Sequence, residues 1–163
     1  MKLKFLLIML MIAGFARVYA QNNPENDHEG DHHHHHHKNE LGLSNSAVYI
    51  FEEEKLAYSL HLHYIRLLGD SKFGLGPGVE MIFGEHSHNT VGLVLAYSPL
   101  EPLTLAITPG VTFGHESHNE FSMAAEAIYA FNIGVFHIGP AIEFSYLPHD
   151  YHISVGFHIG FGF

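Results

Sequence analysis

The sequence predicts an all-β fold: an eight-stranded antiparallel up-and-down transmembrane β-barrel, preceded by a cleaved signal peptide and a disordered His-rich segment. Three observations lead to this prediction. From Leu41 onward large apolar residues alternate with small or polar ones, which is typical of strands with two different faces. Hydrophobic residues make up 47% of the 163 residues and charged residues only 15%, where about a quarter is usual in a soluble domain. The chain has no Cys, which excludes disulfides and thiolate metal sites.

Residues 1–20 have the three parts of a secretory signal peptide. Two lysines precede an apolar run, Phe5–Phe15, and the segment closes on Val18, Tyr19 and Ala20, a pattern that suits signal peptidase. The apolar run is shorter than the roughly 20 residues that a spanning helix needs, which favours cleavage over an uncleaved anchor. Cleavage would leave 17 acidic residues against four basic ones, a net charge of −13. Such an acidic chain is not expected to bind nucleic acid.

Residues 21–40 form an acidic segment with no apolar residue that could join a core, so we expect it to be disordered. Seven of the 17 histidines lie in this segment. Six of them form an uninterrupted run, His32–His37. This run is embedded in the segment and does not stand at a chain end, which favours a native tract over an engineered tag. Imidazoles at this density bind divalent metal ions, and the candidate ligands are His32, His33, His34, His35, His36 and His37.

The alternation divides residues 41–163 into eight strands. It is clearest in the last strand, where every second residue from Tyr151 to Phe163 is large and apolar and the residues between are His, Ser or Gly. It is least regular in the first strand, because Asn45 falls on the apolar face. The expected strands are 42–51, 56–68, 73–83, 90–98, 103–113, 121–131, 136–146 and 151–163.

The two faces of these strands indicate which side meets lipid. The second face consists mostly of Gly, Ala, Ser and Thr, and residues 41–163 contain only three basic residues, too few to coat a soluble lipocalin-like barrel. Small side chains do fit the narrow interior of an eight-stranded closed barrel. The large apolar face would then contact lipid, and closure of the barrel would satisfy every backbone polar group.

Residues 41–163 resemble the small eight-stranded outer-membrane barrels of Gram-negative bacteria, the OmpA/OmpX-like class. The resemblance rests on the signal peptide, the eight alternating strands and the terminal HIGFGF. It implies an outer-membrane location, an N-terminal segment in the periplasm, and contact with outer-membrane lipid and lipopolysaccharide. In this class the assembly machinery recognises a terminal Phe, here Phe163. The resemblance also implies a monomer.

Three prolines fall inside expected strands, where each removes a ladder donor. Pro77, Pro109 and Pro140 recur 32 and 31 residues apart in GPGVE, TPGVT and GPAIE, a spacing that matches a two-strand repeat. We expect bulges or local bends at these positions.

If both chain ends lie in the periplasm, alternate connections face outward, and every His-bearing connection falls on the same outer rim. The outer connections are 52–55, 84–89, 114–120 and 147–150, and the inner ones are 69–71, 99–102 and 132–134. Imidazole and carboxylate ligands suit Zn²⁺, Ni²⁺ or Cu²⁺, although polar loops facing lipopolysaccharide would explain the same residues. The candidate metal ligands are His86, His88, His115, His118, His149 and His152, with Glu85, Glu116 and Asp150 among them.

The same register places carboxylates and imidazoles inside the barrel, without Lys or Arg. They are Glu80, Glu126, Glu143, His61, His63, His137 and His158. Buried carboxylates must be protonated, paired with His⁺ or bound to metal. We expect a hydrogen-bonded plug that fills and stabilises the lumen, in preference to a metal or proton pathway.

The sequence therefore favours a non-enzymatic outer-membrane barrel that needs no cofactor and binds or buffers divalent metal. An open diffusion pore is not expected, because eight strands leave little lumen. The alternative is a lipid A deacylase-like hydrolase, since GHESHNEF resembles the His-x-Ser-Asn stretch of that enzyme. Its candidate catalytic residues are His115, Ser117 and Glu120, although His118 separates Ser117 from the following Asn.

Overall fold

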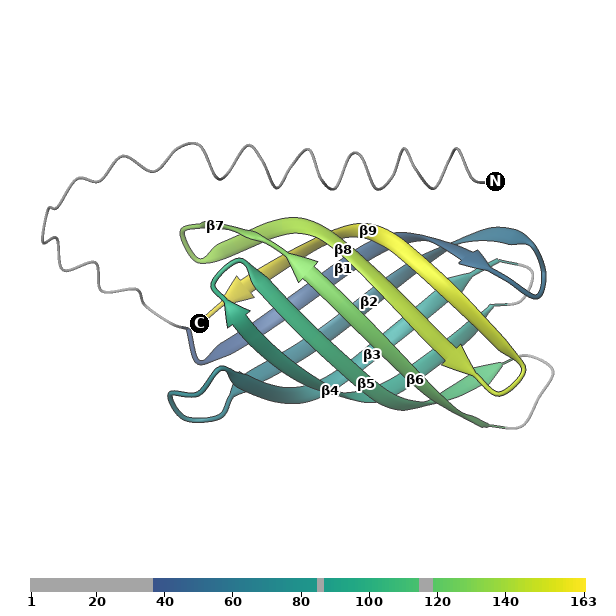
Figure 1. The fold of residues 1–163 in the computed structure, drawn as a ribbon, viewed down its shortest axis with the longest axis horizontal. Coiled ribbons are helices and arrows are strands. Elements are labelled where there is room, and N and C mark those ends of the chain that lie inside the picture. The colour runs from purple at the N-terminus through teal and green to yellow at the C-terminus, as the bar shows by residue number, and fades with distance from the viewer. Residues whose placement is uncertain (1–36, 85–86, 115–118) are drawn as a thin grey trace, which may run out of the picture. The chain divides into compact units, whose positions relative to one another are not determined.

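The structure is a computed structural model that describes residues 37–84, 87–114 and 119–163. Its strands are β1 (Asn39–Ile50), β2 (Lys55–Leu67), β3 (Phe73–Phe83), β4 (His88–Leu100), β5 (Leu103–Gly114), β6 (Glu120–Tyr129), β7 (Phe131–Ile133), β8 (Phe136–Leu147) and β9 (Asp150–Gly162). Consecutive strands pair antiparallel from β1 to β6 and from β7 to β9, β6 pairs with β8, and β1 pairs with β9 (Figure 1). The sheet is therefore a closed barrel. Among the described residues, no helix has the length and apolar character needed to span a membrane.

The nine segments form eight barrel strands, because β6 and β7 are two parts of one strand. Ile128 of β6 pairs with Ala141 of β8, and Phe131 of β7 pairs with Ile138 in the same register. Only the short break at Ala130 separates the two parts. The predicted count of eight antiparallel strands is confirmed.

The prolines interrupt the ladders without the predicted bulges. In β3, Pro77 pairs with Leu93 of β4 in an unbroken ladder, whereas the ladder with β2 is interrupted opposite Tyr64 and resumes in the same register. Pro109 and Pro140 likewise interrupt only the ladder with the preceding strand. Each proline lacks one N–H and so removes donors on one side only, which requires no inserted residue.

A register shift does occur elsewhere, between Tyr97 and Leu100 on the β4–β5 pair. This position is next to the tight connection from β4 to β5 and contains none of the three repeated prolines. The irregularity of the barrel is thus associated with a strand end, and the middle of every strand keeps its register.

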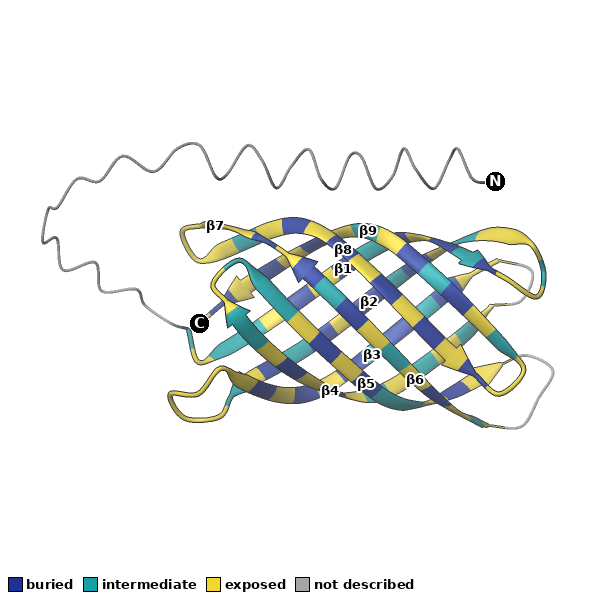
Figure 2. Ribbon diagram, in the orientation of Figure 1, coloured by how far each residue is buried: buried dark blue, intermediate teal, exposed yellow. Residues whose placement is uncertain are grey.

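Burial alternates along the long strands, as the sequence predicts, most regularly in β8 and β9 (Figure 2). Small, polar and ionisable side chains fill most of the interior together with three clusters of aliphatic side chains around Ile65, Ile82 and Ile128, and large apolar side chains cover the outside. Aromatic pairs lie at both ends of the outer surface: Phe51 stacks on Tyr151 at one end and Phe73 on Tyr97 at the other, each with ring centroids 4.7 Å apart. Aromatic rings at both ends of an apolar band are typical of transmembrane barrels.

The chain ends define the two rims. The β1–β2, β3–β4, β5–β6 and β8–β9 connections open at one end, which we call the outer rim. The remaining connections open at the other end, the inner rim, where β1 begins and β9 ends (Figure 1). The predicted grouping of the connections is therefore confirmed.

The first strand begins at Asn39, three residues before the predicted start at residue 42. The backbone N–H of Asn39 donates to the carbonyl of Phe163 (3.0 Å), and the N–H of Phe163 donates back to the carbonyl of Asn39 (2.9 Å). These two bonds extend the closing seam to the last residue of the chain. As a consequence Glu40, which the sequence analysis placed in the disordered segment, belongs to the barrel wall.

Candidate functional site

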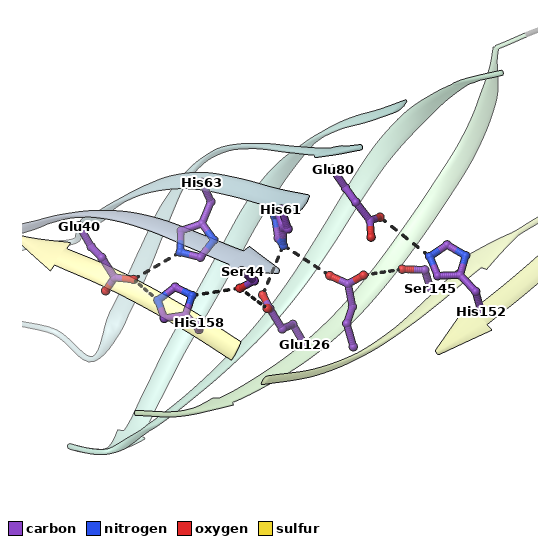
Figure 3. A network of polar contacts seen from close by, with 10 residues as sticks. Glu40, Ser44, His61, His63, Glu80, Glu126, Ser145, His152 and His158 are labelled. Carbon is purple, nitrogen blue, oxygen red and sulfur yellow. Dashed lines mark hydrogen bonds and ion pairs between the residues drawn. The ribbon is translucent and has the colours of Figure 1, made fainter. Parts of the chain in front are cut away.

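A column of Glu and His side chains runs along the lumen from the inner rim towards the outer rim (Figure 3). All of the lumen residues that the sequence predicts are buried or half-buried on the inward face. Among the described residues every Lys and Arg is exposed, so the column contains no fixed cation. The column consists of Glu40, His61, His63, Glu80, Glu126, His137, Glu143, His152 and His158.

At the inner rim one carboxylate faces three imidazoles, and we call this group the inner hub (Glu40, His63, His137 and His158). Glu40 Oε1 lies 3.3 Å from Nε2 of His63, 3.4 Å from Nε2 of His137 and 3.6 Å from Nε2 of His158. The rings of His63 and His158 stack with centroids 5.3 Å apart. The inner hub therefore has ample donors for its single carboxylate.

Glycines make room for these rings. A Cβ at Gly42 would collide with the imidazole of His63 and lie 2.6 Å from Cε1 of His158. A Cβ at Gly160 would collide with the ring of His137. The small residues on the inward face are therefore complementary in shape to the histidines, as expected for a lumen filled by side chains.

In the middle of the lumen a single imidazole lies between two carboxylates. Nδ1 of His61 is 3.6 Å from Glu126 Oε2 and 3.5 Å from Glu143 Oε2. The hydroxyl of Ser44 donates to Glu126 Oε1 (3.3 Å) and lies 3.0 Å from Nδ1 of His158, which links this part to the inner hub. The contacts form one connected polar network.

Towards the outer rim lies a group with the opposite balance, which we call the outer triad (Glu80, Glu143 and His152). One ligand atom from each residue lies within 4.8 Å of the other two. His152 Nε2 is 3.9 Å from Glu80 Oε2, and the hydroxyl of Ser145 donates to Glu143 Oε1 (3.0 Å). Two further groups meet the same criterion, Glu40–His137–His158 and His61–His63–Glu126.

The lumen holds little free space. One cavity has a volume of about 20 Å³ and is lined by the outer triad and by polar residues that include Thr90 and Ser122. A second, of about 10 Å³, lies beside Ser44, His61 and Glu126. Each has room for about one water or one ion, since a water needs roughly 10–15 Å³ by this measure. The arrangement suits proton sharing or ion binding, and it does not suit the flow of solutes.

Of the six predicted rim histidines, the structure describes His88, His149 and His152. His152 is not exposed at the rim: its side chain is 1% accessible and belongs to the outer triad. Its ring lies 5.9 Å from that of His88, centroid to centroid, and His149 is exposed in the β8–β9 turn. The other rim histidines, His86, His115 and His118, lie outside the described residues, as do His32–His36.

The alternative catalytic set cannot be assembled from the described residues. Glu120 begins β6 and is half-buried, whereas His115 and Ser117 lie outside the described part of the chain. The sequence analysis also missed Glu40, because a polar residue next to a polar tail gives no local sign that it continues a strand. Two-residue alternation extended backward from Gly42 would have placed it on the inward face.

These features define a class of structure: a closed eight-stranded barrel with an apolar outer face and a polar, filled lumen, as found in outer-membrane barrel proteins. No protein-family model matches the chain, and no curated protein sequence matches it. Solved structures do match. The barrel is similar to Ail, the attachment invasion locus protein of Yersinia pestis, with a TM-score of 0.57 and 16% identity over 78% of this chain and 99% of Ail.

Neisserial surface protein A (NspA) matches with a TM-score of 0.61 and 5% identity, over 77% of this chain and 96% of NspA. A de novo designed transmembrane β-barrel matches with a TM-score of 0.52 and 10% identity, over 74% of this chain and 94% of the design. Ail and NspA are both Gram-negative outer-membrane barrel proteins. At these identities the likeness establishes the fold of this chain.

Proposed function

We propose that the protein is a monomeric, non-enzymatic barrel of a Gram-negative outer membrane, with its N-terminal segment in the periplasm, that binds divalent metal ions at its outer rim. The apolar outward face supports contact with outer-membrane lipid and lipopolysaccharide. The metals that fit the ligands are Zn²⁺, Ni²⁺ and Cu²⁺, because the chain offers imidazole and carboxylate but no thiolate.

The observation that carries this proposal is the gathering of histidines at one rim. The connections 84–89, 114–120 and 147–150 all open at the outer rim, and together they contain five histidines, four acidic residues and no Lys or Arg. Within the described part, His88 and His149 stand at the ends of two of these connections. Carboxylates beside imidazoles favour cations, and so this rim is poorly suited to a polyanion such as the heparin analogue that Ail binds.

The test is isothermal titration of the full chain with Zn²⁺, Ni²⁺ and Cu²⁺ in detergent. A tail variant replaces His32–His37 with Ser, and a rim variant replaces His86, His88, His115, His118 and His149 with Asn. The proposal predicts that the tail variant keeps micromolar or tighter binding and that the rim variant binds fewer ions than the unchanged chain, because only the rim ligands have been removed from it. Equal binding by the rim variant and the unchanged chain would contradict it.

The hydrolase alternative makes a different prediction. If His115, Ser117 and Glu120 acted on lipid A, cells with and without the gene would differ in lipid A acylation. Mass spectrometry of lipid A reads this directly. Unchanged acylation together with metal binding at the rim supports the non-enzymatic barrel.

A further inference from the structure

We propose that the outer triad is a built site for one divalent transition-metal ion of the Zn²⁺ class inside the barrel. The site goes beyond the rim and tail: it uses Glu80, Glu143 and His152, and none of the loop or tail histidines. Each ligand comes from a different strand, β3, β8 or β9. The barrel wall itself therefore fixes their relative positions, which favours a preformed site over one assembled by loops.

The donor atoms have the right identity and nearly the right spacing. One imidazole nitrogen and two carboxylate oxygens lie within 4.8 Å of one another. Ligands at about 2.0–2.1 Å from Zn²⁺ in a tetrahedron stand roughly 3.3 Å apart. Side-chain rotations that move each donor atom by about an ångström would therefore close the group around an ion. Neutral imidazole nitrogen and carboxylate oxygen are both ordinary ligands of such metals.

The histidine of the triad is buried without a hydrogen-bond partner among the described residues, and its Nε2 reaches Glu80 only at the ion-pair distance of 3.9 Å. Its side chain is 1% accessible, and among the described residues neither ring nitrogen of His152 has a hydrogen-bond partner. The hydroxyl of Ser122, which lines the same cavity, is also without one. Buried polar atoms are costly unless they are satisfied, so these atoms point to a ligand in the cavity between them.

The charge balance distinguishes the outer triad from the inner hub. Glu40 has three imidazoles within 3.6 Å of one carboxylate oxygen, so its charge is already surrounded by donors. In the outer triad two carboxylates face one imidazole that has no hydrogen bond among the described residues, and Glu143 shares the further imidazole of His61 with Glu126. A divalent ion would neutralise both carboxylates and give His152 a bond at once.

The cavity supplies the remaining coordination position. The ion would lie between the three donor atoms, and the adjoining cavity of about 20 Å³ accommodates one water, which the polar side chains of Thr90, Ser122 and Ser145 suit. Three protein ligands and one water would complete a tetrahedron. Ser145, which donates to Glu143, would orient that ligand in the way that outer-shell hydrogen bonds commonly do.

The test uses the full chain with His32–His37 replaced by Ser and His86, His88, His115, His118 and His149 replaced by Asn, which removes the rim and tail ligands. Refolded in detergent, this background is expected to bind one Zn²⁺ or Co²⁺ per barrel, with a visible Co²⁺ absorption band of tetrahedral N/O coordination. Glu80→Gln and His152→Asn are expected to weaken binding by more than about 100-fold, since even outer-shell changes cost 10–100-fold.

Glu126→Gln is the matched control, because it removes another buried lumen carboxylate that lies outside the triad; its affinity should stay within about threefold of the background. Heat-modifiable gel mobility establishes that each variant is folded, and Glu80→Asp, which keeps the charge, should recover part of the affinity if Glu80→Gln folds poorly. A folded background that binds no ion, or equal losses in Glu80→Gln and Glu126→Gln, would overturn the site. Either result leaves the rim proposal to its own test, because the rim ligands are absent from this background.

Discussion

Replacement of His61 should destabilise the barrel more than replacement of either carboxylate that it contacts. His61 is 6% exposed, and its Nδ1 lies between Glu126 Oε2 (3.6 Å) and Glu143 Oε2 (3.5 Å). Glu126 and Glu143 are also direct register partners on β6 and β8. Without the imidazole, two adjacent buried carboxylates would have no cation between them.

The expected magnitude follows from these contacts. Removal of one partner of a buried charge pair costs about 3–5 kcal/mol, so His61→Asn should lower the free energy of unfolding by about 3 kcal/mol or more. Glu126→Gln should cost only about 0–1 kcal/mol, because the amide still accepts from Ser44 and the His61–Glu143 contact remains. The difference between the two variants, about 3 kcal/mol, is therefore the informative quantity.

The assay is equilibrium unfolding in guanidinium chloride from lipid vesicles, followed by far-ultraviolet circular dichroism and gel mobility, because the chain has no Trp to report by fluorescence. His149→Asn is the matched control: it makes the same chemical change at an exposed turn, and its midpoint should equal that of the unchanged chain. A His61→Asn barrel as stable as the unchanged one, or one no less stable than Glu126→Gln, would refute the reasoning.

Three further predictions concern the packing, the lumen and the chain end. Gly42→Ala should destabilise the barrel by about 1–3 kcal/mol, because its Cβ collides with His63; Gly84→Ala, whose Cβ would meet Ala57 alone among the described residues, at 3.8 Å, should unfold like the unchanged chain, and equal midpoints of the two variants would contradict the packing argument. Planar-bilayer recordings should show conductance near zero, since the two lumen cavities measure only about 20 and 10 Å³, and a large steady conductance would contradict a filled lumen. Phe163→Ala should reduce the amount of barrel inserted in cells but not refolding in detergent, because the seam with Asn39 uses backbone atoms; normal insertion would argue against recognition of this residue.

The strands and their faces could be predicted because they depend on a local pattern. Alternation with period two is visible within any one strand, and a strand with one lipid-facing side has only one acceptable orientation. The same pattern gave the inward position of Glu80, Glu126 and Glu143 and the grouping of the connections. The sequence does not reveal which inward residues meet across the lumen. That depends on the relative stagger of strands that are not neighbours.

The outer triad illustrates this limit. Glu143 and His152 lie on adjacent strands, but Glu80 comes from β3, which is separated from β8 by β2, β1 and β9 on one side. No spacing in the sequence connects the three residues. His152 was accordingly interpreted as a rim ligand from its nearness to the β8–β9 connection. It lies on the inward face of β9, and its side chain is therefore buried in the lumen. The bulges predicted at the three prolines failed for a related reason. The effect of a missing N–H depends on which neighbouring strand the nitrogen faces, and this is not visible in the sequence.

The lumen combines two different solutions to the burial of carboxylates without Lys or Arg. At the inner rim three imidazoles surround one carboxylate, so the donors outnumber the charge and the contacts stabilise the seam where β1 and β9 close the barrel. Towards the outer rim two carboxylates meet one imidazole, so the group is short of positive charge and has a cavity where that charge could sit. A lumen that served stability alone would have no reason to leave both ring nitrogens of His152 without a hydrogen bond within the described part of the chain. The asymmetry therefore separates a structural end, next to the chain termini, from a ligand-binding end below the outer rim.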